Sequence, residues 1–175
     1  MKKIILSLAL LFGIMLNSNA QDPGHVSFST YVGTAIDLTT PSYTPLTWHV
    51  LGHYNFNKRF SAGIGTGVSI YERTLIPVYA DVRYNLTKPH KFVPYLECGS
   101  GYSFVTSKNA NGGFYLNPSI GLKFAVCKNK SILLSIGYEL QELERLKTYE
   151  DKYAATAFQE HLSHNSISFK MGYSF

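Results

Sequence analysis

A histidine and a serine separated by one residue, His161 and Ser163, form the pair whose types could support nucleophilic chemistry. Residues two apart in an extended segment share a face, so His161 could act as a base toward Ser163. The base in turn needs a third group to orient it. Glu160 is adjacent, but no acidic residue follows Ser163. A polar segment without catalytic activity is therefore the favoured interpretation.

Two other histidines, His49 and His53, lie four residues apart. On one strand they would share a face but stand about 13 Å apart, at roughly 3.3 Å per residue. That separation is too long for a single metal ion. The sequence therefore predicts polar fillers here, with no metal site and no cofactor.

A third group contains six charged residues: Asp81, Arg83, Glu97, Lys123, Glu139 and Lys170. Each stands at a position that alternates with bulky apolar neighbours, so all six are expected on the same side of their strands. Burying an unpaired charge is costly, so acids and bases that share an interior should pair. We predict a luminal charge network, with a proton path or narrow pore as the alternative.

The strands that would hold these residues follow a predicted export signal. Lys2 and Lys3 precede an apolar run over residues 4–16, and Asn17-Ser18-Asn19-Ala20 ends in a small-residue cleavage pattern. This arrangement is typical of a signal peptide, with a retained anchor as the alternative. Residues 1–20 are therefore assigned to the signal peptide and residues 21–175 to one domain.

Composition narrows the class of protein. The formal net charge is +5, and removing Lys2 and Lys3 leaves 14 basic against 11 acidic residues. This excess is too small to indicate nucleic-acid binding. Charged residues make up only 15% and aromatic residues 14%, an unusual balance for a water-soluble domain.

From residue 25 onward the dominant hydrophobic period is two, which predicts strands. The expected strands are 25–38, 45–57, 59–71, 74–87, 91–105, 113–126, 131–143 and 164–175. Tight turns at 57–59, 87–90 and 128–130 alternate with loops at 39–44, 106–112 and 144–163, apart from a brief link at 72–73. The last loop has room for a short helix. The pattern predicts an all-β, eight-stranded antiparallel up-and-down transmembrane β-barrel.

The two faces of these strands differ strongly. One is bulky and apolar, as in Ile64, Val82 and Leu134, and the other is small or charged, as in Gly63, Asp81 and Ser135. A soluble carrier barrel would turn the apolar face inward and leave glycine and serine outside. A membrane barrel of eight strands has room inside only for packed side chains, which suits the small face.

Aromatic residues gather near the expected short turns: Tyr54, Phe56, Phe60, Tyr84, Phe92, Phe124, Tyr173 and Phe175. Membrane barrels place such girdles at the interface with water.

The two cysteines, Cys98 and Cys127, are expected to be free thiols. A hairpin about 106–112 would place Cys98 near Ile120 and Cys127 near Lys91, roughly 20 Å apart. A disulfide cannot span that distance.

The segment with apolar residues at every second position, Ile167, Phe169, Met171, Tyr173 and Phe175, resembles the C-terminal strand signal of outer-membrane barrels. The resemblance implies recognition by the barrel-assembly machinery. With the segments 117–121 and 135–138, the mature chain is similar to the small OmpA/OmpX-like, porin-family β-barrel proteins. This implies the outer membrane of a diderm bacterium, with both termini periplasmic. No peptidoglycan-binding domain follows, so no cell-wall tether is expected.

The function predicted is a structural or surface-interaction role, adhesive or in envelope integrity, with no enzymatic activity and no open pore. Outer-membrane lipid is the expected surrounding, and loops 106–112 and 144–163 are the expected contact sites for an external partner. One alternative is a soluble periplasmic barrel that carries an apolar ligand. The other is a lipid A deacylase, a family with a His-x-Ser pair that His161 and Ser163 resemble, although His164 follows where that family has asparagine.

Overall fold

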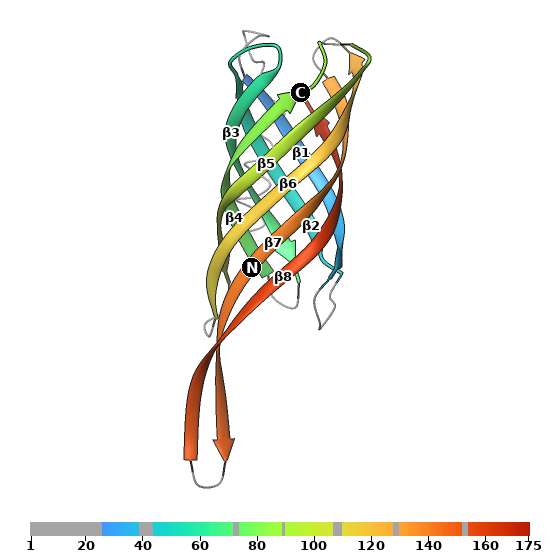
Figure 1. Cartoon of the computed structure of the whole chain (residues 1–175). Coiled ribbons are helices and arrows are strands. Elements are labelled where there is room, and N and C mark those ends of the chain that lie inside the picture. The colour runs from blue at the N-terminus through green and yellow to red at the C-terminus, as the bar shows by residue number, and fades with distance from the viewer. Residues whose placement is uncertain are drawn as a thin grey trace, which may run out of the picture.

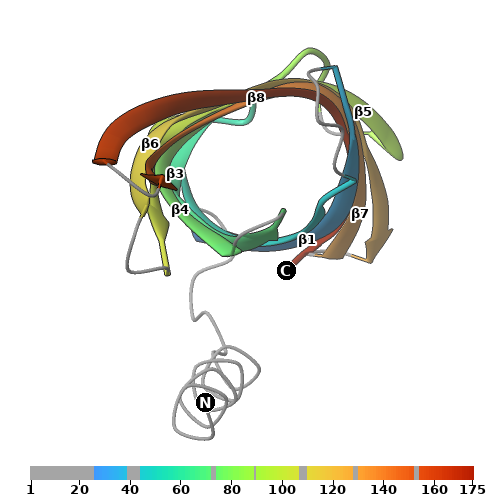
Figure 2. The same cartoon turned by 90° about the horizontal axis from the view of Figure 1, so that it is seen from below.

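The computed structural model describes residues 26–38, 44–71, 74–88, 90–106, 110–127, 130–151 and 154–175. They form eight strands: β1 (Val26–Asp37), β2 (Leu46–Asn55), β3 (Phe60–Ile70), β4 (Thr74–Asn85), β5 (Phe92–Val105), β6 (Ala110–Cys127), β7 (Lys130–Asp151) and β8 (Ala154–Ser174). Each strand pairs antiparallel with the next, and β8 pairs with β1 to close a barrel (Figures 1 and 2). The predicted all-β up-and-down barrel is therefore confirmed. No helix among the described residues is long and apolar enough to cross a membrane.

The closing seam between β1 and β8 runs from the pair Ser29 and Ser174 to the pair Asp37 and Ser166. Beyond Ser29, the backbone N–H of Phe28 donates to Phe175 and that of Phe175 donates to Phe28, at 3.0 and 2.9 Å. Closure leaves the barrel wall without an unpaired strand edge.

The connections after β2, β4 and β6 lie at one end of the barrel, called here the short-turn end after the tight turns predicted there (Figure 1). The first is held by Asn57, whose Oδ1 accepts from the backbone N–H of Arg59 and of Phe60, both at 2.8 Å. This is the local bond through which asparagine favours a tight turn. The opposite end is called the hairpin end.

Burial alternates along the strands with the period that the sequence predicts. In β4, Leu75, Tyr79 and Asp81 are buried, whereas Ile76 and Val78 are exposed. Successive side chains of a strand point to opposite faces, so one set fills the barrel and the other covers its outer wall.

The prediction of a loop over 144–163, with room for a short helix, was wrong. β7 continues to Asp151 and β8 begins at Ala154, so the two strands form a ribbon that extends beyond the barrel wall (Figure 1). Their register sets Arg145 opposite Glu160 and Asp151 opposite Ala154. The apolar spacing of this segment is weak, so the pattern did not indicate that the two strands continue. The segment 106–112 is also shorter as a loop, because β6 begins at Ala110.

Candidate functional site

The interior of the barrel carries the polar face predicted from the sequence. The buried polar side chains include Ser29, His49, His53, Ser61, Ser69, Asp81, Arg83, Asn117, Glu139, Ser168, Lys170 and Ser174. Of the six charged residues singled out above, Glu97 and Lys123 are half-buried on the same face, and the other four are buried. Closure of the barrel thus brings all six into one lumen.

The lumen also holds a cluster of large side chains that sequence analysis did not single out: Tyr31, Leu51, Tyr79, Tyr95, Tyr115 and Leu133. A usable signal existed, since Tyr79 has the same parity in β4 as Asp81 and Arg83. Because the inward face was expected to carry only small or charged side chains, aromatic rings were not predicted there.

These rings fit because glycines on neighbouring strands leave space for them. A Cβ at Gly65 would stand 2.6 Å from the Tyr79 ring, and one at Gly99 would stand 2.8 Å from it. A Cβ at Gly121 would meet the Tyr95 ring at 2.4 Å. The inward glycines therefore determine where the luminal tyrosines lie.

One polar cluster begins with His53 and Asp81, whose Nε2 and Oδ2 atoms are 2.7 Å apart. The residues lie on β2 and β4, with β3 between them. Gly63 on β3 stands opposite both His53 and Asp81. Because Gly63 has no side chain, the imidazole can reach across β3 to the carboxylate.

The same cluster continues to Arg83 and Glu97, directly opposite each other on β4 and β5. Arg83 Nε donates to Glu97 Oε2 at 2.6 Å, and Arg83 Nη2 donates to the Tyr31 hydroxyl at 2.9 Å. The guanidinium also lies 5.3 Å from the centre of the Tyr95 ring. Arg83 is therefore held by an ion pair, a hydrogen bond and an aromatic face together.

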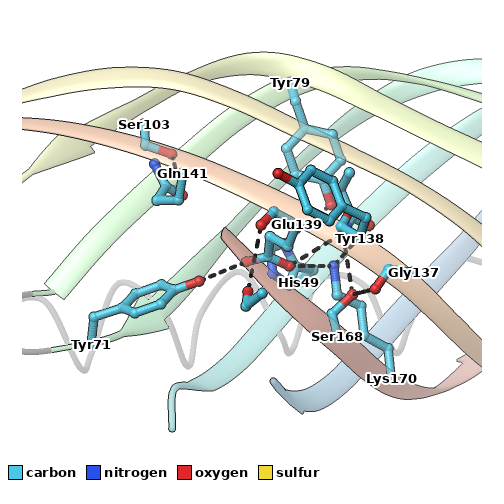
Figure 3. A network of polar contacts seen from close by, with 12 residues as sticks. His49, Tyr71, Tyr79, Ser103, Gly137, Tyr138, Glu139, Gln141, Ser168 and Lys170 are labelled. Carbon is cyan, nitrogen blue, oxygen red and sulfur yellow. Dashed lines mark hydrogen bonds and ion pairs between the residues drawn. The ribbon is translucent and has the colours of Figure 1, made fainter. Parts of the chain in front are cut away.

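A second cluster centres on Glu139 of β7 (Figure 3). Its Oε2 lies 3.0 Å from Lys170 Nζ, and its Oε1 accepts from the Tyr71 hydroxyl at 3.1 Å. Lys170 also donates to Asn117 Oδ1 at 3.0 Å. Both oxygens of a fully buried carboxylate are thus bonded, which offsets the cost of removing its charge from water.

The Asn117 side chain replaces a backbone hydrogen bond that is missing between β6 and β7. The flanking pairs set Pro118 opposite Tyr138, but no pair forms there, because proline has no N–H to donate. The Asn117 side chain donates instead, from Nδ2 to the Tyr138 carbonyl, at 3.1 Å. A side-chain amide therefore supplies the bond that the strand backbone cannot make.

A third set of polar side chains, which includes His164 and Asp37, fills the lumen at the hairpin end. His164 Nδ1 lies 3.7 Å from Asp37 Oδ2, and the imidazole stacks on the Tyr71 ring with centroids 5.2 Å apart. Burial raises the pKa of Tyr71, and the nearby Glu139 charge raises it further, so the hydroxyl remains a donor. Nearby, Ser103 donates to Gln141 at 2.9 Å.

The pairing of the six charges differs from simple acid and base matching. Arg83 pairs with Glu97 and Lys170 with Glu139, whereas Asp81 pairs with a histidine. Among the described residues, no carboxylate lies within ion-pair distance of Lys123. Lys123 therefore faces the lumen without a carboxylate partner in the described part of the chain.

The other luminal histidine has different surroundings. His49 Nδ1 lies 3.2 Å from the Tyr79 hydroxyl, and its ring stacks on Tyr115 with centroids 6.2 Å apart. His49 and His53 thus share a face, as expected, but belong to separate groups of contacts.

The outer wall is apolar along its length. Exposed large side chains include Val32, Leu46, Ile64, Val78, Val82, Leu96, Ile120, Leu122, Leu134, Ile136 and Met171. Ile64 is the extreme case, with 75% of its surface exposed. A continuous apolar surface of this kind marks contact with a partner or a membrane.

Aromatic side chains meet near the short-turn end. Ring centroids are 5.2 Å apart for Phe92 and Phe124, and 6.2 Å apart for Phe28 and Phe175. Tyr173 and Phe175 also touch, at 6.2 Å. These contacts join β5 to β6, and β1 to the C-terminal residue that follows β8.

The predicted assembly residues Phe169, Met171 and Tyr173 point outward from β8 and are exposed, and Phe175 is half-exposed. Their partners across the two seams are residues of β1 and β7. The segment is therefore the last strand of the closed wall.

Ser163, the nucleophile of the deacylase alternative, lies at the base of the ribbon and is exposed. The Asn165 side chain donates to Ser163 Oγ at 3.4 Å. The side chain of His161 lies outside the described residues. His164 follows on the opposite face of β8 and contacts Asp37 instead.

Cys98 is a free thiol on the outer wall. The register places it opposite Pro118, two residues from the expected Ile120. Cys127, whose backbone ends β6, stands nine residues further along that strand than Pro118, or roughly 30 Å at about 3.3 Å per residue. Such a distance cannot be bridged by a disulfide.

Comparison with known proteins defines the fold. No protein-family model matches the chain, and no curated protein does. Among solved structures it is similar to the outer-membrane protein AlkL (TM-score 0.59, 11% identity, 91% of this chain and 92% of that one). It is also similar to Neisserial surface protein A (0.54, 14%, 87% and 96%) and to the N-terminal barrel domain of Pseudomonas aeruginosa OprF (0.51, 14%, 85% and 97%). The chain therefore has the fold of the small eight-stranded outer-membrane barrels.

Proposed function

We propose that this chain is an integral outer-membrane protein that acts as a surface-interaction module, with the β7 and β8 ribbon as its contact element. Residues 1–20 would direct export, and the C-terminal strand would be read by the barrel-assembly machinery. Both termini of the mature chain would then face the periplasm, and the hairpin end of the barrel would face outward. No enzymatic activity is part of this proposal.

The membrane location is supported by the contrast between the two faces of the wall. Side chains such as Ile64 and Met171 are exposed, whereas Asp81 and Lys170 are buried inside. A soluble carrier of an apolar ligand would require the reverse arrangement. Lipid would cover the apolar wall, and each strand of the closed barrel already pairs with a strand on either side.

A role without an open pore is supported by the contents of the lumen. Tyr79, Tyr95 and Tyr115 lie fully or almost fully buried across it, together with Leu133. The two polar clusters occupy further inward positions. An eight-stranded barrel has an interior just wide enough for such side chains.

The observation that carries the surface role is the ribbon. The pairing of β6 with β7 ends at Arg145, and that of β1 with β8 ends at Ser166. Beyond these points, β7 and β8 pair only with each other in the described part of the chain, from Leu146 opposite Gln159 to Asp151 opposite Ala154. Each strand there has an open edge, which is the feature that accepts an added strand.

A register-preserving deletion tests the proposal. Removing 146–151 and 154–159 together takes equal lengths from both strands and leaves Arg145 opposite Glu160. Cells of a diderm bacterium that express the full chain should show adhesion or self-aggregation that the trimmed chain lacks. Both chains should reach the outer membrane and shift on gels when boiled. Equal adhesion by the two chains, or recovery as soluble protein, would overturn the proposal.

A further inference from the structure

The short-turn half of the lumen holds a set of metal-ligating side chains that the structural role does not explain. His53, Asp81 and Glu97 each offer one ligand atom, and these atoms all lie within 4.8 Å of one another. They come from β2, β4 and β5. His53 and Asp81 are buried, and the Glu97 side chain is 9% exposed.

The carboxylates retain capacity for a further ligand. Asp81 bonds to His53 through Oδ2, and Glu97 bonds to Arg83 and Tyr31 through Oε2. In the described part of the chain, no hydrogen bond reaches Asp81 Oδ1 or Glu97 Oε1. Each of the two acids thus leaves one carboxylate oxygen without a hydrogen bond to the described residues.

Glycines keep this part of the lumen open. Gly63 stands between His53 and Asp81, and a Cβ at Gly99 would lie 3.3 Å from Asp81 Oδ1. A side chain at either position would occupy the space beside the ligand atoms. The site is therefore formed by residues of four consecutive strands, with glycines on two of them.

We propose that His53, Asp81 and Glu97 bind one divalent first-row transition-metal ion, of which zinc suits the ligands best. An imidazole nitrogen with two carboxylate oxygens is a three-ligand set that leaves one position for water. Tetrahedral bonds of about 2.1 Å place ligand atoms about 3.4 Å apart. His53 Nε2 and Asp81 Oδ2 are 2.7 Å apart, so these two atoms separate by several tenths of an ångström when the ion enters between them.

The surrounding charges set the expected strength of binding. Two carboxylates match a divalent ion, but Arg83 bonds to Glu97 and Lys123 lies on the same luminal face. These cations weaken binding by repulsion in a poorly screened interior. Removing the Lys123 charge should therefore strengthen binding about tenfold, an effect that a purely structural cluster would not show.

The decisive experiment is a metal titration of the full mature barrel refolded in detergent micelles. Cobalt(II) is followed by its visible absorption, and zinc by competition for the same site. The expected result is one equivalent of metal per chain, weakened at least about tenfold by His53→Ala, because a ligand is lost. His49→Ala is the matched control, a second buried histidine of β2 that has tyrosine neighbours. Lys123→Met should bind more tightly than the parent chain.

Each variant is first shown to fold by its boiling-dependent gel shift. Absence of saturable binding by the folded parent chain would overturn the proposal. Binding that His53→Ala and Asp81→Asn leave unchanged would also overturn it, because the ion would then lie elsewhere. A loss caused equally by His49→Ala would point to a general effect of luminal histidines and would have the same consequence.

Discussion

Phe28 and Phe175 exchange two backbone hydrogen bonds and stack their rings, and so complete the seam that closes the barrel. Deleting Phe175 removes both bonds and the ring contact. We expect the free energy of unfolding to fall by about 2–3 kcal/mol, from two hydrogen bonds at about 1 kcal/mol each and one aromatic contact. The measurement is urea unfolding of the refolded barrel, together with the heat-modifiable fraction in cells.

Phe92→Ala is the control for this deletion, because it removes a girdle ring that contacts Phe124 away from the closing seam. It should leave assembly in cells close to that of the parent chain. Normal assembly of the chain that lacks Phe175 would contradict the importance of this closure.

The ion pair between Lys170 and Glu139 should behave as a buried pair. Lys170→Met leaves the Glu139 carboxylate buried without its cation and should cost about 3–5 kcal/mol. Replacing both residues, as Lys170→Met with Glu139→Leu, should recover most of that loss, because no isolated charge remains. Urea unfolding measures the double-mutant cycle, and additive losses would show that the two side chains are not coupled.

Variants of Asn117 and Pro118 test whether the Asn117 side chain replaces the missing backbone hydrogen bond to Tyr138. Asn117→Leu removes the donor to the Tyr138 carbonyl and should destabilise the barrel by about 1–3 kcal/mol. Pro118→Ala restores a backbone N–H at the interrupted position, so it should reduce the cost of Asn117→Leu when the two are combined. Pro118→Ala in the parent chain is the control. No rescue in the double variant would mean that Asn117 acts through its contacts with Glu139 and Lys170.

The tyrosine cluster should determine whether ions pass. Tyr79→Ala removes a ring that fills the space above Gly65 and Gly99. We expect the parent barrel to show background conductance in a planar lipid bilayer and the variant to show measurable single-channel events. Tyr84→Ala, an exposed position of the same strand, is the control. Conductance of the parent chain equal to that of Tyr79→Ala would contradict a sealed lumen.

The thiols should remain reduced. Cys98 is free on the wall, and the register separates it from Cys127 by roughly 30 Å. A refolded barrel should therefore run identically on gels with and without reductant. Alkylation of the unfolded chain should count two thiols, and a count of none would indicate an internal bridge.

Strand number and inward parity followed from the amino-acid order alone, because side-chain direction in a strand depends only on odd or even position. Gly63, Asp81 and Lys170 were assigned to the interior in this way, and Ile64 and Val82 to the outer wall. The same odd-or-even rule also places Tyr79 in the interior, but a side chain of that size was not expected on the inward face. The extent of β7 and β8 was missed because charged residues obscure the period beyond Leu143.

Which inward residues meet depends on the stagger between strands, and the sequence does not determine that stagger locally. Asp81 contacts His53 because Gly63 stands between them in the register of β2, β3 and β4. Glu139 meets Lys170 because β7 and β8 pair with a specific offset. The sequence by itself determined a closed, two-faced barrel and the small and charged residues of its lumen. Only the tertiary structure decided their partners, because closure of eight strands fixes a register that no single strand contains.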